Sequence, residues 1–263
     1  MILFFLFLLL WMGPVQRLII FPLVWLLPGR RTRILGRWIR IQAWITRLIV
    51  SYGAGVRIHV SGATVHESSI VVMNHQSVLD VMIILSEVRG PAVLIPVRTR
   101  YRHGMPGISP YLRVAGYPFI SQKRSLIERD LAEMAAGADR LAAGEATIAI
   151  FPEGHRTRDG NIAAFMTRGL QKLVKRAPRP VYCFVGDGMW QVRTVADGMT
   201  SLAGTNVNVR VLGPFDAPKE ESEIPRFIEW LRERMIAAMD EMRATETRSP
   251  DVRRPALEAR VAD

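Results

Sequence analysis

The chain has 263 residues, 49% of them hydrophobic, and a formal net charge of +11. This length and apolar content exclude a disordered chain and allow one large α/β domain or two small ones. The single cysteine, Cys183, excludes an internal disulfide and a Cys-x-x-Cys zinc pair. Positive charge gathers at the N-terminus, since the first acidic residue, Glu67, is preceded by eight arginines: Arg17, Arg30, Arg31, Arg33, Arg37, Arg40, Arg47 and Arg57.

Residues 1–52 are predicted to form a membrane-associated helical segment. The opening run MILFFLFLLLWMGPV is uncharged but shorter than the ~20 residues of a straight membrane span. Gly13-Pro14, Arg17 and Pro22 interrupt the longer apolar stretch, so a kinked span and a helical hairpin within one leaflet are both open. We expect the segment to be retained, because it has neither the basic start nor the small-residue cleavage site of a secretory signal.

The second half of this segment has the periodicity of an amphipathic helix. Trp38, Ile41, Trp44, Ile45 and Leu48 recur at helical spacing, with arginines on the other side. Such a helix fits the headgroup layer of an anionic membrane, and its arginines favour the cytoplasmic side, where we place the rest of the chain. The alternative is a core helix with a solvated basic face. Nucleic acid is not an expected partner, because the tryptophans and leucines would then face water; the sequence leaves the oligomeric state open.

Residues 53–244 alternate between predicted strands and helices. We expect strands at 55–62, 68–74, 91–97, 117–122, 146–154, 179–185 and 206–215, and helices at 78–88, 127–144, 169–177 and 224–244. The alternation predicts an α/β domain whose mainly parallel central sheet is flanked by helices. The polar residues 245–263 are predicted to be a disordered tail.

Polar clusters follow three of the predicted strands, at the edge where open parallel sheets bind ligands. The first is the stretch VVMNHQSVLD, residues 71–80, with His75 before a helix and Asp80 in its first turn. In one interpretation Ser77 and Asp80 form a capping box. In the other, Asp80 accepts a hydrogen bond from the imidazole and makes His75 a general base. The stretch alone leaves both interpretations open.

The other two clusters are basic. In IFPEGHRTRDG, residues 150–160, Gly154 permits a close backbone approach and Arg156 can bind a phosphate bidentately. Glu153 would orient that arginine or bind a substrate hydroxyl, although a surface turn with an exposed ion pair is also compatible. Lys123 and Arg124 follow the strand at 117–122 and would add positive charge to the same pocket, although such a pair is commonly just solvated.

In this order and spacing, the motifs Asn-His-x₄-Asp and Phe-Pro-Glu-Gly-x-Arg resemble the glycerolipid acyltransferase family, most closely the bacterial 1-acylglycerol-3-phosphate acyltransferases. The resemblance covers roughly residues 30–215 and implies transfer of a fatty acyl group from acyl-CoA or acyl carrier protein to the sn-2 hydroxyl of lysophosphatidic acid, giving phosphatidic acid. It implies that His75 deprotonates the hydroxyl and Asp80 orients His75. It also implies that a phosphate is held by Glu153, Gly154, Arg156, Lys123 and Arg124, without metal or cofactor, and that an N-terminal helical element is embedded in the membrane.

The sequence independently favours direct attack, because it has no Gly-x-Ser-x-Gly elbow and Cys183 sits in an apolar strand. It departs from the family at Gln122, where an arginine is usual, at His155 and Met166, and at Cys183. All four changes concern acceptor recognition. Two alternatives therefore stay open: the same chemistry on another lysolipid, such as a lyso-ornithine lipid or a lysophospholipid, and a non-catalytic membrane-bound subunit.

Overall fold

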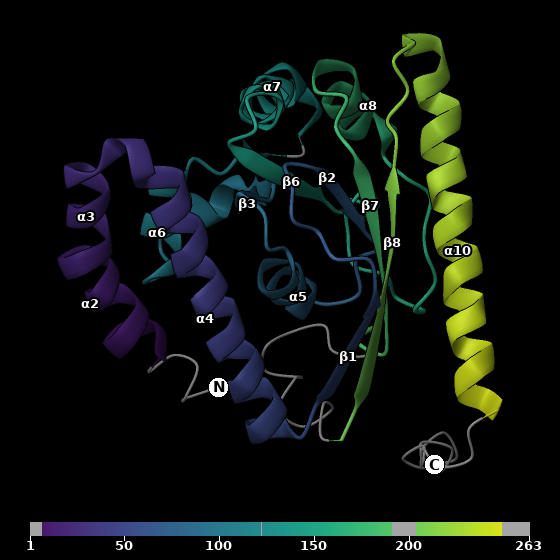
Figure 1. The fold of residues 1–263 in the computed structure, drawn as a ribbon, viewed down its shortest axis with the longest axis horizontal. Coiled ribbons are helices and arrows are strands. Elements are labelled where there is room, and N and C mark those ends of the chain that lie inside the picture. Colours follow the sequence, from purple (N-terminus) through teal and green to yellow (C-terminus); the bar gives the residue numbers. More distant parts are fainter. Residues whose placement is uncertain (1–6, 122, 191–203, 249–263) are drawn as a thin grey trace.

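A six-stranded sheet forms the centre of the computed structural model, which describes residues 7–121, 123–190 and 204–248 (Figure 1). The strand order is β1-β8-β7-β2-β6-β3. The strands are β1 (Arg57–Gly62), β2 (Ile70–Met73), β3 (Ala92–Leu94), β6 (Ala146–Ile150), β7 (Val181–Asp187) and β8 (Asn206–Phe215). Strands β7, β2, β6 and β3 are parallel to one another, whereas β8 is antiparallel to β7 and parallel to β1. The predicted mainly parallel sheet is confirmed, with two strands at one edge running the opposite way.

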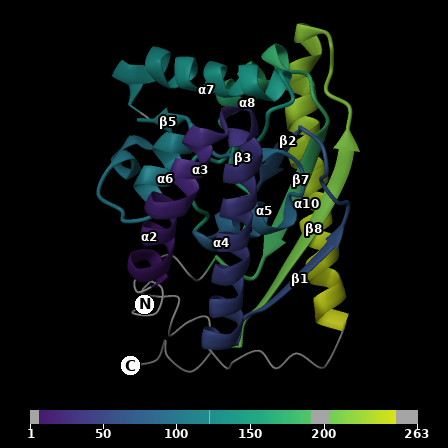
Figure 2. The same cartoon turned by 60° about the vertical axis from the view of Figure 1, so that its left-hand side comes forward.

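Helices cover both faces of the sheet (Figures 1 and 2). On one face, α4 (Arg31–Ala54) packs on α5 (Leu79–Glu87) and on β3. On the other, α7 (Ile127–Ala142) packs on α8 (Thr167–Arg176) and on β6, while α10 (Ile224–Arg248) packs on α8 and β7. This arrangement confirms the flanking helices that the alternation of strands and helices predicts.

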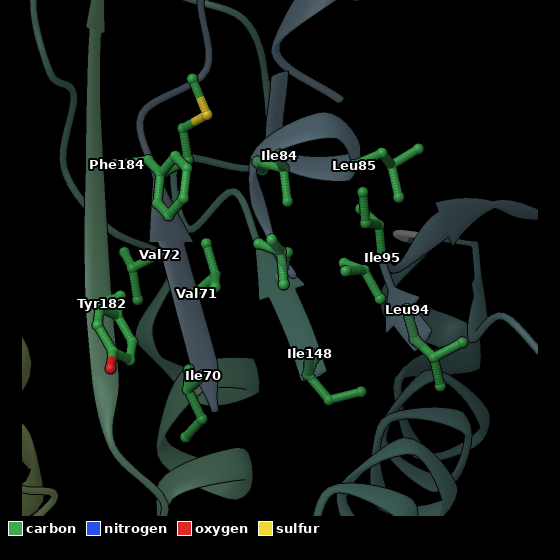
Figure 3. Close-up of a cluster of buried hydrophobic side chains, with 14 of the residues drawn as sticks. Ile70, Val71, Val72, Ile84, Leu85, Leu94, Ile95, Ile148, Tyr182 and Phe184 are labelled. Carbon is green, nitrogen blue, oxygen red and sulfur yellow. The ribbon is translucent and has the colours of Figure 1, made fainter. Parts of the chain in front are cut away.

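The hydrophobic core lies along the central parallel strands. It holds the end of β2, and so the start of the His75 loop, in place. Ile70, Val71 and Val72 of β2 are fully buried, and β2 lies between β7 and β6 at the centre of the sheet. Figure 3 shows these residues beside Ile84 of α5 and Ile148 of β6. A strand covered on both faces carries a continuous apolar run, as this one does. Burial therefore anchors both β2 and α5, the two elements that flank the His75 loop.

One predicted strand does not join the central sheet. Within residues 117–122, the described strand is only β5 (Phe119–Ile120), and it pairs with β4 (Val97–Arg98) in a separate two-stranded sheet. Beyond β5, the backbone N–H of Ser121 donates to a side chain of α7 and not to another strand. Its acceptor is Oδ1 of Asp130, at 2.8 Å. The expectation that residues 121–125 lie at the same sheet edge as His75 is therefore wrong. The connection around this small sheet contains η4 (Thr99–Arg102), α6 (Ile108–Ala115) and η5 (Arg124–Leu126).

Residues 7–54 form a two-helix hairpin, named the N-terminal hairpin below (Figure 1). Its first arm alternates π-helical and α-helical turns: η1 (Phe7–Met12), α2 (Gly13–Val15), η2 (Gln16–Ile20) and α3 (Phe21–Leu26). Pro14 and Pro22 lack a backbone N–H, and π turns accommodate such breaks in the helical hydrogen-bond ladder. The chain turns at η3 (Pro28–Arg30) into α4, the second arm. The 18-residue stretch Leu9–Leu26 is long and apolar enough to cross a membrane, and most of it is exposed.

The second arm of the hairpin only partly matches its predicted amphipathic face. Trp38 is 6% exposed and packs within the protein, whereas Ile41 and Trp44, predicted on the same face, are 51% and 56% exposed. Arg47 pairs with Glu87 and ties this helix to α5. Helix α4 is thus a core helix along one stripe and exposes apolar side chains along another, because it covers α5 with only part of its circumference.

The C-terminal helix is longer than expected. After η6 (Glu221–Glu223), α10 continues through Arg248, so placing the start of the tail at Thr245 is wrong by four residues. Its helical hydrogen bonding continues past the last apolar residues, on which the predicted boundary depends. The rest of the predicted tail, residues 249–263, lies outside the described residues, as does Gln122.

Candidate active site

His75 and Asp80 are hydrogen-bonded across the turn between β2 and α5. Nδ1 of His75 lies 2.8 Å from Oδ2 of Asp80. The same Oδ2 accepts the backbone N–H groups of Gln76, at 2.7 Å, and of Ser77, at 2.8 Å. One carboxylate oxygen thus contacts the imidazole and also accepts two backbone N–H groups of the turn, while the hydroxyl of Ser77 accepts from Leu79 and not from Asp80, so the capping box is only half formed.

The environment of the pair distinguishes the two imidazole nitrogens. Asp80 is buried, and burial raises the pKa of its carboxyl above the ordinary value, while hydrogen bonds from His75, Ser77 and Gln76 act in the opposite direction. His75 keeps 19% of its side chain exposed. No described residue forms a hydrogen bond with its Nε2. Nδ1 is therefore committed to Asp80, and Nε2 is the ring nitrogen that a ligand could contact.

The loop after β6 holds His75 from three sides. The ring of Phe151 stacks on the imidazole, with centroids 4.1 Å apart and planes 21° from parallel. The backbone N–H of Thr157 donates to the carbonyl of His75 at 2.8 Å, and Oε1 of Glu153 accepts the N–H of His75 at 2.8 Å. Residues 74–80 and 151–163, named the catalytic edge below, thus form one connected unit.

Glu153 has a different placement from the one expected of a substrate ligand. It is buried, and its second oxygen, Oε2, accepts the backbone N–H of Ala163 at 2.9 Å. Burial raises the pKa of the Glu153 carboxyl, while the N–H groups of Ala163 and His75 lower it. With both oxygens bonded to backbone, Glu153 joins the two loops of the catalytic edge. This geometry favours a positioning role over the expected contact with a substrate or with Arg156.

Gly154 is required by the conformation of its loop and by a neighbouring side chain. Its φ is +70°, in the left-handed region, and a Cβ there would lie 2.6 Å from the sulfur of Met166. Met166 is 63% exposed, so an apolar side chain covers the turn on its solvent side. The close approach predicted for Gly154 is thus made by Met166.

The three basic residues of the predicted phosphate site occupy two different places. Arg156 is exposed on the loop of the catalytic edge, directly before Thr157. Lys123 and Arg124 are exposed beyond β5, and within the described part of the chain no hydrogen bond or ion pair joins their side chains to the His75 loop. Arg156 therefore lies on a loop of the catalytic edge, whereas Lys123 and Arg124 lie at the start of η5, after β5.

The described residues do not form two other common types of reactive centre, a metal site and a reactive thiol. Among the described residues, no group of three or more His, Cys, Asp or Glu side chains could hold a metal ion. Cys183 is buried within β7, and burial raises the pKa of its thiol well above the ordinary value. A thiol in such a site is unreactive.

Sequence reasoning missed several residues that support His75. Phe151 and Thr157 contact it directly, although both lie in the motif that predicts the anion site. The side chain of Asn74 exchanges two hydrogen bonds of 2.8 Å with the backbone of Gly186 and so extends the pairing of β2 with β7. The motif marks Asn74 and Phe151 as candidates, but their partners depend on the fold.

Comparisons with known proteins show what this chain is similar to in sequence. Residues 57–186 match the family model described as Acyltransferase. Human 1-acyl-sn-glycerol-3-phosphate acyltransferase alpha is 32% identical over 137 residues, which cover 51% of this chain and 47% of that protein. Its mouse counterpart is 27% identical over 205 residues, 75% of this chain and 70% of that protein. The matched region is thus about half the length of the human relative.

A solved structure shares the fold. The crystal structure of the 1-acyl-sn-glycerophosphate (LPA) acyltransferase PlsC from Thermotoga maritima superposes with a TM-score of 0.59, covering 80% of this chain and 81% of that one. Sequence identity is 21%, so this likeness concerns the fold. The central sheet and its flanking helices are therefore an architecture that PlsC also has.

Proposed function

We propose, from the membership of residues 57–186 in the acyltransferase family, that this chain is a 1-acylglycerol-3-phosphate O-acyltransferase. It transfers a fatty acyl group from acyl-CoA or acyl carrier protein to the sn-2 hydroxyl of lysophosphatidic acid, and phosphatidic acid is the product. The observation that carries the proposal is the hydrogen bond between His75 and the buried Asp80, which leaves Nε2 available.

The reaction follows from that pair as a general-base mechanism. Nε2 of His75 removes the proton of the acceptor hydroxyl as its oxygen attacks the thioester carbonyl. Asp80 fixes the tautomer of the ring and stabilises the imidazolium that forms. The tetrahedral intermediate collapses, the carbon–sulfur bond breaks, and His75 returns the proton to the departing thiolate. Ester and free thiol are formed, and the base is regenerated without metal or cofactor.

Arg156 is the residue best placed to bind the acceptor phosphate. It is exposed on the loop whose next residue, Thr157, contacts the backbone of His75. A guanidinium suits bidentate binding of a phosphate. Lys123 and Arg124 would contribute from the start of η5. We place the N-terminal hairpin in the membrane and the catalytic domain on the cytoplasmic face, as the apolar first arm and the eight N-terminal arginines favour.

Met166 supports a second candidate, the same reaction on another lysolipid. Its exposed thioether covers Gly154 beside Arg156, at a position where the family usually has a lysine. An apolar group there removes one positive charge from the vicinity of the acceptor headgroup. A lyso-ornithine lipid or a zwitterionic lysophospholipid would tolerate that loss better than lysophosphatidic acid.

The test is acyl transfer by the full chain in lipid vesicles, with both donors and a series of lysolipids. His75→Ala and Asp80→Asn should each lower kcat by about 10²–10⁴-fold, the usual contribution of general-base catalysis. His66→Ala, at an exposed histidine outside the catalytic edge, should leave kcat unchanged. Turnover of a different lysolipid alone would select the second candidate. If the wild type turned over no acceptor, the proposal would be overturned in favour of a non-catalytic subunit.

A further inference from the structure

Arg243, near the C-terminal end of α10, connects that helix to two other elements. Its Nε donates to Oδ2 of Asp187 at 2.7 Å, and its Nη2 donates to Oδ1 at 3.1 Å. Nη2 also donates to the carbonyl of Gly160 at 2.8 Å, and Nη1 donates to Oδ1 of Asn161 at 3.0 Å. A fork-to-fork arginine–carboxylate pair is among the stronger and more directional polar contacts. Arg243 therefore joins α10 to the end of β7 and to the catalytic edge.

Gln76 continues this connection into the loop of His75. It is buried directly after His75, and its Nε2 donates to Oδ1 of Asp187 at 3.1 Å. Its Oε1 accepts the backbone N–H of Met189 at 3.0 Å. Its own backbone N–H donates to Oδ2 of Asp80, the oxygen that also contacts the imidazole. A continuous path of hydrogen bonds thus runs from Arg243 through Asp187, Gln76 and Asp80 to His75.

The path controls a loop whose position affects the reaction rate. A buried amide whose oxygen and nitrogen are both bonded has one orientation, so Gln76 fixes the backbone on the C-terminal side of His75. Without Arg243, the Asp187 carboxylate loses its counter-charge and two donors, and it becomes free to turn away from Gln76. Misplacing a catalytic group by about 1 Å costs on the order of 10²-fold in rate.

We propose that Arg243 is a positioning residue for acyl transfer, holding the loop that presents His75 to the acceptor hydroxyl. It acts through Asp187 and Gln76. The inference rests on the proposed function and extends it, because Arg243 lies outside the residues 57–186 that match the family model. The catalytic machinery would therefore include the C-terminal helix.

A second ion pair on the same helix provides a matched control. Arg210 of β8 donates to Oε2 of Glu241 at 2.7 Å, two positions along the chain from Arg243. This pair also joins α10 to the sheet, but among the described hydrogen bonds it has none to the catalytic edge. Glu241→Ala therefore removes a contact between helix and sheet and leaves the path to His75 intact.

The experiment measures kcat and KM for donor and acceptor with the full chain in vesicles. Arg243→Ala should lower kcat by about 10²-fold while each KM changes by less than about threefold. Arg243→Lys, which keeps the charge but loses the fork, should recover part of that loss. Combining Gln76→Ala with Arg243→Ala should give a variant no slower than the slower single variant, because both act through one path.

Hydrogen exchange gives a readout that does not depend on turnover. Peptides covering residues 74–80 should exchange faster in Arg243→Ala than in the wild type, and at the wild-type rate in Glu241→Ala. The inference is overturned if Arg243→Ala keeps the kcat of Glu241→Ala, or if its exchange over 74–80 is unchanged. Absence of wild-type turnover would instead contradict the proposed function, and exchange would then test the path by itself.

Discussion

The catalytic edge and the N-terminal hairpin both bury polar side chains, but the partners of those side chains differ. At the catalytic edge, Glu153 and Gln76 bond every polar atom of their side chains, largely to backbone groups, although Oδ1 of Asp80 has no partner among the described residues. In the hairpin, Gln16 is fully buried and neither its Oε1 nor its Nε2 has a partner among the described residues. In Gln42, Oε1 accepts from Trp11 at 3.2 Å, while Nε2 lacks such a partner.

The exposure of apolar side chains also differs between the hairpin and the elements that flank the catalytic edge. Those of the strands and of α5 are buried between sheet and helices (Figure 3). On the first arm of the hairpin, Leu10, Leu18 and Trp25 are 71%, 77% and 81% exposed. Polar groups inside and apolar groups outside are the distribution expected of helices in lipid. This distribution is the one that the proposed placement of the hairpin in a membrane predicts, whereas the catalytic edge is organised mainly by hydrogen bonds.

Among the variants that test this comparison, Glu153→Gln is expected to have the largest effect on stability and kcat. Glu153→Gln keeps the size of the side chain but replaces one acceptor oxygen by an N–H₂ group, which would face the backbone N–H of His75 or Ala163. Leaving such a donor unpaired costs about 1–3 kcal/mol of unfolding free energy. A displaced His75 should lower kcat by about 10²-fold. Thermal unfolding and steady-state kinetics measure both effects.

The same variant separates the positioning role from substrate binding. If Glu153 contacted the acceptor, KM for the acceptor would rise and stability would be unchanged. Glu145→Gln, at an exposed glutamate outside the catalytic edge, serves as the control and should alter neither quantity. If Glu153→Gln were as stable as the wild type, this would contradict the assignment of Glu153 as a buried residue that bonds two backbone N–H groups.

Much of the fold follows from local patterns in the sequence. Continuous apolar runs predict the buried parallel strands, and alternation predicts β8 with the bounds that the structure has, Asn206–Phe215. The pairing of His75 with Asp80 is also local, since the two residues share one turn. By contrast, the two residues of β5 carry no information about their partner, which is β4 rather than the central sheet.

Contacts between residues far apart in the sequence could not be predicted either, because no local pattern identifies the partner. The partners of Glu153 are backbone N–H groups, which every residue except proline has, so only the path of the loops selects them. Arg243 and Asp187 are 56 positions apart, and no spacing rule connects them. The split of α4 into a buried and an exposed apolar stripe depends on how much of its circumference α5 covers.

A smaller effect would test the hairpin side of the comparison. Replacing an exposed apolar residue of the first arm by a polar one, in Leu18→Asn or Trp25→Ser, should weaken binding to anionic vesicles by about tenfold, since burying one such side chain is worth about 1.5–3 kcal/mol. Flotation of the purified protein with the vesicles measures this. The matched control is Trp230→Ser on α10, which should float as the wild type does. Unchanged flotation of both hairpin variants would break the comparison.

The smallest expected effect is a pH dependence at Asp187, which ends β7 and is hydrogen-bonded to Gln76 of the catalytic edge. Burial acts to raise the pKa of Asp187, but hydrogen bonds from Arg243 and Gln76 outweigh it and hold the pKa below its ordinary value. Since the folded-state pKa is depressed, the carboxylate stabilises the fold at every pH above its unfolded value of about 3.9, and that stability is lost as pH falls through the folded value. Asp159 and Asp240 also lie near Arg243 and share its charge.

Asp187→Asn should therefore be less stable than the wild type by about 1 kcal/mol at pH 7, the usual worth of one such hydrogen bond. The difference should persist at pH 5 and shrink below pH ~4, as the wild-type carboxyl takes up its proton. Melting temperatures of the two proteins at pH 7, 5 and 3.5, in one detergent, measure it. A difference that stayed constant across this range would mean that Asp187 stabilises the fold through its shape, so that packing rather than charge would connect β7 and α10 to the catalytic edge.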